Sequence, residues 1–120
     1  MTLEKLRAYC LSLPAAVENQ PWTNPRYQYL VTYTVGGRWF CLLDIDEQRV
    51  NIKCNPERVV EMQSRYNGAF PAWHMNKEHW LGVKLESDIP EDVMKTLLRD
   101  AHSLIVARLP RKLRAELGLG

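Results

Sequence analysis

Residues 27–44 have the sequence YQYLVTYTVGGRWFCLLD, and this stretch decides the fold. In its first half, tyrosine or valine occupies nearly every second position, a period of two that predicts a half-buried strand beginning at Arg26. Gly36-Gly37 then predicts a two-residue hairpin turn, because both turn positions need a positive φ. The returning segment, 38–44, is apolar from Trp39 to Leu43, which predicts a central strand. An antiparallel hairpin therefore forms the centre of the predicted fold.

Further elements are expected on both sides of the hairpin. Period-two patterns predict two more strands, at 49–54 and 79–85. Helical spacing of apolar residues predicts helices at 3–12, 56–66, 91–108 and 111–117. Residues 15–25 contain two prolines and two asparagines and are expected to form a loop. The predicted order, α-β-β-β-α-β-α with a last short helix, describes one α+β domain over residues 1–120, in which helices cover an antiparallel sheet.

Capping residues mark the expected ends of these helices. Thr2 and Asn55 are the predicted N-caps of the first two helices, and Pro56 suits a first helical position. On this basis Asn55→Ala is expected to cost about 1 kcal/mol of stability. Asn67-Gly68 predicts a left-handed end to the second helix.

Composition limits the classes of function. A chain of 120 residues with 46% apolar and 25% charged residues is typical of one globular domain. Its apolar runs are too short to cross a membrane, so no membrane partner is expected. Three scattered cysteines without a C-x-x-C pair, and charges near the N-terminus, predict a reduced, cytoplasmic protein. We expect a monomer without a cofactor.

Positive charge is concentrated near the C-terminus, although the net charge is only +2. The cations of this tail are Arg108, Arg111, Lys112 and Arg114, and its one acid is Glu116. A basic tail attracts polyanions and is a candidate for contacts with nucleic acid. A solvated helix end, with cations at the negative end of the helix dipole, is the alternative interpretation.

A second candidate site lies in residues 73–80, WHMNKEHW. Tryptophan offers a stacking surface, lysine a phosphate contact, and asparagine and histidine hydrogen bonds, a combination that suits nucleic acid or a small anion. The candidate residues are Trp73, His74, Asn76, Lys77 and His79. Lys53 joins them if its strand neighbours that of Trp80. The alternative is a structural corner, with Trp80 in the core and polar groups holding the backbone.

Three segments resemble the MmcQ/YjbR family of small bacterial proteins. They are 50–57 (VNIKCNPE), 71–80 (PAWHMNKEHW) and 18–22 (ENQPW). The first and the long C-terminal helix also fall where that family has them, so the resemblance covers nearly the whole chain. It implies a CyaY-like α+β fold, related to that of frataxin. It also implies DNA binding, a function that the family's likeness to a double-wing DNA-binding shape suggests.

No metal or catalytic centre is expected. His74 and His79 are five positions apart, which fits neither one face of a helix nor one face of a strand. Cys41 and Cys54 lie in apolar strand patterns, where buried thiols are inert. The sequence contains no G-x-S-x-G, Walker or G-x-G-x-x-G motif.

The sequence therefore predicts a non-enzymatic DNA-binding protein that uses Lys53, residues 73–80 and the basic tail. The alternative is a module that binds a small ligand or a protein through residues 73–80 and binds no nucleic acid. Salt distinguishes the two, because phosphate contacts release counterions and weaken as ionic strength rises.

Overall fold

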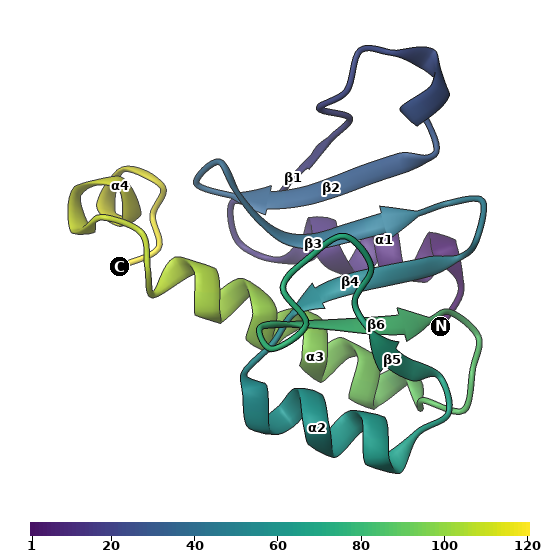
Figure 1. The fold of residues 1–120 in the computed structure, drawn as a ribbon. Helices are drawn as coiled ribbons and strands as arrows, with labels where there is room; N and C mark the ends of the chain where they lie inside the picture. The colour runs from purple at the N-terminus through teal and green to yellow at the C-terminus, as the bar shows by residue number, and fades with distance from the viewer.

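An antiparallel sheet of six strands carries the fold, in the order β1-β2-β3-β4-β6-β5 (Figure 1). The structure is a computed structural model that describes residues 1–120. Its four longer strands are β2 (Leu30–Val35), β3 (Arg38–Asp44), β4 (Arg49–Lys53) and β6 (Trp80–Lys84). Short strands, β1 (Val17–Asn19) and β5 (Ala69–Pro71), form the two edges. All neighbouring strands run antiparallel, as the predicted fold class requires.

Three helices, α1 (Leu3–Ser12), α2 (Pro56–Arg65) and α3 (Glu91–Val106), lie on one side of this sheet. A short fourth helix, α4 (Arg111–Glu116), follows α3. Figure 1 shows α1 and α3 behind the sheet, α2 along its β5 edge, and α4 beyond the end of α3. Thr2 is the N-cap of α1, as predicted, and its hydroxyl accepts a hydrogen bond from the amide of Lys5 at 3.2 Å.

The Gly36-Gly37 turn joins β2 to β3, with φ angles of 59° and 80°. Beyond it the register shifts, because Thr34 pairs with Trp39 whereas Tyr33 pairs with Cys41. Phe40 is the extra residue of this β-bulge. It is fully buried, and its ring lies 5.5 Å from that of His102 in α3, so the bulge adds a second side chain to the helix side.

Strand register assigns each strand residue to one of two faces, because directly paired residues point to the same side. Tyr33, Cys41, Ile52 and Leu81 form a row on the side of α1 and α3, which we call the helix face. The row between, Thr32, Leu42, Asn51 and Gly82, points to the opposite side. We call this side the loop face, because loops rather than helices cover it.

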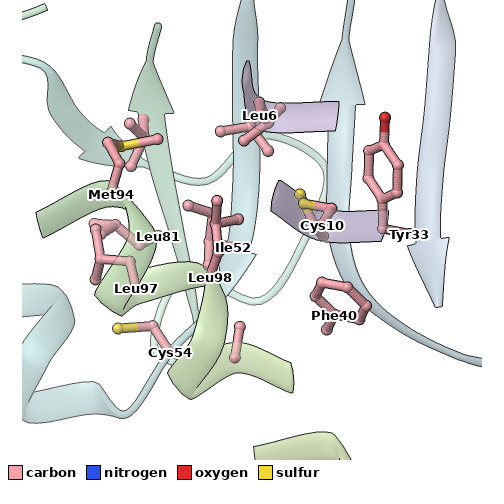
Figure 2. Close-up of a cluster of buried hydrophobic side chains, with 14 of the residues drawn as sticks. Leu6, Cys10, Tyr33, Phe40, Ile52, Cys54, Leu81, Met94, Leu97 and Leu98 are labelled. Atoms are coloured by element: carbon pink, nitrogen blue, oxygen red, sulfur yellow. The ribbon is translucent and has the colours of Figure 1, made fainter. Parts of the chain in front are cut away.

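One hydrophobic core fills the space between the helix face and the helices. It comprises 25 buried residues. Figure 2 shows Leu6 and Cys10 of α1 and Met94, Leu97 and Leu98 of α3 directed toward the strands. All three cysteines are buried and free, and burial raises the pKa of the Cys41 and Cys54 thiols.

Both edge strands lie in segments for which the sequence predicted no strand. β1 lies within the expected loop 15–25, and β5 follows α2. Each has only three residues and one strand neighbour, too few to show a period of two. The prediction that β2 begins at Arg26 is also wrong, because Pro25–Tyr27 form a 3-10 turn. Asn24 caps that turn by accepting from the amide of Arg26 at 3.0 Å.

The predicted half-burial of β2 is wrong as well. Residues 31–35 are buried on both faces. Thr32 and Thr34, on the loop face, are only 0% and 6% exposed. The Thr34 hydroxyl accepts a hydrogen bond from the Asn19 side chain of β1 at 3.0 Å. The Thr32 hydroxyl donates to the Asn19 backbone carbonyl at 3.3 Å.

Two predicted capping interactions are absent. Asn55 occupies the N-cap of α2, but its side chain makes no capping hydrogen bond, so the expected loss of about 1 kcal/mol on Asn55→Ala no longer follows. Asn67-Gly68 is not left-handed, because α2 ends on an extended Tyr66 with φ −128°. The amides of Asn67 and Gly68 instead donate to the Asp88 carboxylate at 2.8 and 2.7 Å, which lowers the pKa of Asp88.

We predict that the two turn glycines differ in their tolerance of alanine. Both have positive φ, which costs an alanine roughly 1–2 kcal/mol. A Cβ on Gly37 would meet nothing within 4 Å, whereas one on Gly36 would lie 2.7 Å from Leu109 Cδ1. Gly36→Ala should therefore cost about 1 kcal/mol more than Gly37→Ala, as measured by urea unfolding at constant slope. Equal losses would show that Leu109 moves away freely.

Candidate binding face

All four tryptophans of the chain lie on the loop face, and all are half-buried. Trp39 pairs with Thr34, and Trp80 pairs with Lys53, which places both side chains on this face. Trp22 reaches it from the loop after β1, and its ring meets that of Trp39 edge-on at 5.6 Å. Because Trp80 is half-buried, the expectation that its ring belongs to the core is wrong.

The first aromatic group lies beside β2 and β3. The ring of Trp22 lies 6.2 Å from that of Tyr27, and the Arg26 guanidinium stands 5.9 Å from the centre of the Tyr27 ring. A hollow of about 360 Å³ adjoins Trp39, and Thr32 and Thr34 are among its polar lining residues. This part of the loop face thus combines exposed aromatic edges with hydroxyl groups and a cation.

The second group is centred on Trp73, in the loop between β5 and β6. Figure 1 shows this loop crossing in front of β3 and β4. The Arg49 guanidinium lies 4.1 Å from the centre of the Trp73 ring and also pairs with the buried Asp44 carboxylate at 3.3 Å. The Trp73 carbonyl accepts from Asn51 Nδ2 at 2.8 Å. Two strand residues therefore hold the loop against the loop face.

Polar residues of the same loop stabilise its own backbone. Asn76 Oδ1 accepts from the amides of Glu78 at 2.8 Å and His79 at 3.2 Å. Lys77 Nζ donates to the Ala72 carbonyl at 2.8 Å. His74 is exposed and has a positive φ of 55°. The expected structural corner is therefore present, and Trp73, His74 and Lys77 remain at its surface.

Lys53 lies next to Trp80, as the sequence analysis required for it to join the site. Its Nζ is 5.5 Å from the centre of the Trp80 ring. The residue is only 8% exposed and takes part in no hydrogen bond or ion pair of its side chain. Burial, and then the nearby charge of Arg108, lower the pKa of the Lys53 ammonium. Lys53 is thus a largely buried residue whose ammonium has no anionic partner.

The basic tail is not one surface. Arg108 lies close enough to Lys53 to influence its pKa. Arg111 and Lys112 are exposed on α4, which lies beyond the end of α3 (Figure 1). Arg114 lines a different groove, beside Leu13 at the end of α1, where its Nε is buried without a hydrogen-bond partner. Of the predicted tail residues, Arg108 alone is placed beside the candidate residue Lys53.

Sequence reasoning missed three residues of this face: Trp22, Trp39 and Arg49. Trp39 stands in an apolar run, which predicts burial on both sides, and Trp22 stands in a proline-rich loop without periodicity. The alternation of β4 is the one usable signal, since Arg49, Asn51 and Lys53 share a face by period two. It identifies the polar face of β4 without showing which aromatic rings lie over it.

No three histidine, cysteine, aspartate or glutamate side chains come together in a way that could hold a metal ion. No helix is long and apolar enough to pass through a bilayer.

Comparison with known proteins identifies the family. A family model described as YjbR matches residues 11–104. The chain belongs to the YjbR family. It is 25% identical to YjbR of Escherichia coli K12 over 118 residues, 95% of either protein. It is also 34% identical over 99 residues to YyaQ of Bacillus subtilis, which covers 70% of this chain and 80% of YyaQ. The predicted family is thus confirmed.

Solved structures confirm the fold. The crystal structure of the Deinococcus radiodurans protein DR2400, described as a DUF419 domain, superposes with a TM-score of 0.86 at 31% identity. The match covers 99% of this chain and 89% of that one. A Pseudomonas syringae protein shares the fold at 22% identity, with a TM-score of 0.72. The names of these YjbR-family relatives and structures state no activity.

We predict that Lys53 opposes folding at neutral pH. Its pKa in the folded protein lies below its ordinary value of 10.5, so the folded state binds the proton less tightly than the unfolded chain does. The resulting cost is present below the folded-state pKa and disappears as pH rises to 10.5. Lys53→Met keeps the apolar stem and should leave the free energy of unfolding at pH 7 unchanged or higher.

Urea unfolding at pH 7 and at pH 10 measures this effect, with Lys84→Met as the control. Lys84 is exposed and donates to the carbonyl of Glu47, so its replacement should cost a few tenths of a kcal/mol. Any advantage of Lys53→Met over the wild type should shrink at the higher pH. A loss above about 1 kcal/mol for Lys53→Met at pH 7 would show that its ammonium stabilises the fold.

Proposed function

We propose that the loop face binds single-stranded nucleic acid, with DNA as the expected ligand. The observation that carries this proposal is the gathering of all four tryptophans, half-buried, on the one face of the sheet that no helix covers. A soluble fold gains nothing from leaving four large apolar rings at its surface. Sheet surfaces with exposed aromatic side chains bind unpaired bases by stacking, whatever the base sequence.

Cations between and beside the rings would supply the phosphate contacts. Those on or beside the loop face are Arg26, Arg49, Lys53, Lys77 and Lys84. The acids on or beside this face are Asp44, which is 1% exposed and paired with Arg49, and the exposed Glu78 of the covering loop. Cations therefore outnumber acids on this face, which attracts a phosphate backbone.

Single strands suit this face better than a duplex. In a duplex the base faces are stacked on each other and cannot reach Trp39 or Trp73. A duplex reader needs an element that enters a groove, and α4, which carries Arg111 and Lys112, is a helix of six residues that lies beyond the end of α3 (Figure 1). The proposal assigns binding alone and no chemical step.

Measuring the binding of a fluorescently labelled oligothymidylate of twelve nucleotides by fluorescence anisotropy tests the proposal. Trp39→Ala should weaken binding by roughly 1–3 kcal/mol if one base stacks on this ring. Tyr9→Ala is the matched control, because Tyr9 is also half-buried and faces a cation, Lys95, at 5.8 Å, but lies on α1 behind the sheet. It should leave affinity unchanged. Urea unfolding of both variants verifies that each is folded.

Salt dependence provides the second measurement. If about three cations contact phosphate, log K falls against log salt with a slope near −2.1, about a 20-fold loss between 50 and 200 mM. No binding at 50 mM salt with tens of micromolar protein would end the proposal, and so would equal affinities of Trp39→Ala and Tyr9→Ala. Salt-independent binding that Trp39→Ala weakens would favour the alternative, an apolar ligand on the same face.

A further inference from the structure

A cavity of about 290 Å³ opens where β4 ends, α2 begins and the second half of α3 passes. Lys53 and Asn55 line it from the strand end and the helix start, and Ser103, Leu104 and Ala107 line it from α3. The volume is close to that of the smaller ligand sites in proteins. Residues 53–57, KCNPE, place a lysine, an asparagine and a helix start within one short segment.

The charges around this cavity leave two cations without anions. Arg58 and Asp100, both in the lining, pair with each other at 2.7 Å and so neutralise one another. Lys53 and Arg108, the neighbour of Ala107, form no ion pair. Their mutual repulsion adds to burial in lowering the pKa of Lys53. A cation that is 8% exposed, close to a second cation and without a counterion, is costly unless an anion binds there.

The start of α2 adds one donor to the same place. Pro56 has no N–H and the amide of Arg58 donates to the Asn55 carbonyl at 3.1 Å, so the amide of Glu57 is the one left free. The Asn55 side chain makes no capping hydrogen bond, and the helix dipole favours negative charge there. An anion at this position would accept from the Glu57 amide and from the Lys53 ammonium.

Leu97 and Leu104 of α3, and Ala107 just after it, add apolar groups to the lining beside the polar Asp100 and Ser103. We propose that the cavity binds a small organic phosphate, with its phosphate at Lys53 and the start of α2, and its apolar body against α3. A phosphate monoester carries about −1.5 to −2 charges at pH 7, which suits an unpaired lysine with a second cation, Arg108, nearby. This site shares Lys53 with the loop face, but it does not depend on the nucleic-acid proposal.

Calorimetric titration with phenyl phosphate tests this inference, with phenol and inorganic phosphate as partial ligands. Phenyl phosphate should bind at least tenfold more tightly than either, because each lacks one half of the contacts. Lys53→Met should weaken phenyl phosphate binding by about 10- to 100-fold. Lys84→Met removes the same charge at the other end of the sheet and should leave binding unchanged.

Ser103→Trp provides a variant that leaves the cations in place. Ser103 is exposed on α3, so a tryptophan there fills the cavity from outside and should abolish phenyl phosphate binding. It does not touch the loop face, so oligothymidylate binding should persist if that proposal also holds. Phenyl phosphate that binds no better than phenol, or equally well to wild type and Lys53→Met, would overturn the inference.

One further comparison distinguishes binding of a free organic phosphate from binding of the terminal phosphate of a nucleic acid. Oligothymidylates with and without a 5′-phosphate should bind alike if the cavity takes free organic phosphates. A stronger interaction of the phosphorylated strand, lost in Ser103→Trp, would assign the same phosphate site to a nucleic-acid end. Absence of binding by both phenyl phosphate and the terminal phosphate would refute the site.

Discussion

Burial of one sheet face under α1 and α3 is the constraint on which the rest of the molecule depends. Because side chains alternate along a strand, burying Tyr33, Ile52 and Leu81 against these helices sends their neighbours to the other side. A shift of register by one residue would exchange the two faces and expose the core. The hairpin turn and the bulge at Phe40 set the register of β2 with β3, and so they also decide where Trp39 points, whereas the pairing of β4 with β6 places Lys53 and Trp80.

The packing of the core therefore determines which side chains point to the loop face, and these side chains differ chemically from those of the core. Its central residues, Thr32, Leu42 and Asn51, are buried, and a few interactions hold the covering loop in place. Asn51 makes one of these interactions, since its side-chain amide donates to the Trp73 carbonyl while its Oδ1 is buried without a partner. Arg49 makes another, between Asp44 and the Trp73 ring. Rigid strands thus position aromatic and cationic groups that the loops leave partly exposed.

How far the sequence predicted these features depends on the length of each pattern. Long periodic segments, such as the hairpin and the α3 helix, show their structure locally, and the predicted hairpin was confirmed over residues 30–44, although not its start or its half-burial. The three-residue edge strands β1 and β5 exist only because a neighbour pairs with them, so no local signal marks them. The sequence left open whether Lys53 joins the site, and the pairing of β4 with β6 meets that condition by placing Lys53 beside Trp80. The contact of Trp22 with Trp39 joins a loop to a strand, and no spacing in the sequence shows it.

The claim that the loop face is a binding face is tested most directly by the indole N–H signals of the four tryptophans in nitrogen-proton NMR spectra. Titration with unlabelled oligothymidylate should shift several of these signals together, with those of Trp39 and Trp73 among them. The backbone amides of α1, on the other side of the sheet, should stay in place. Indole signals that do not move while amides of α4 shift would contradict the account and assign binding to the basic tail.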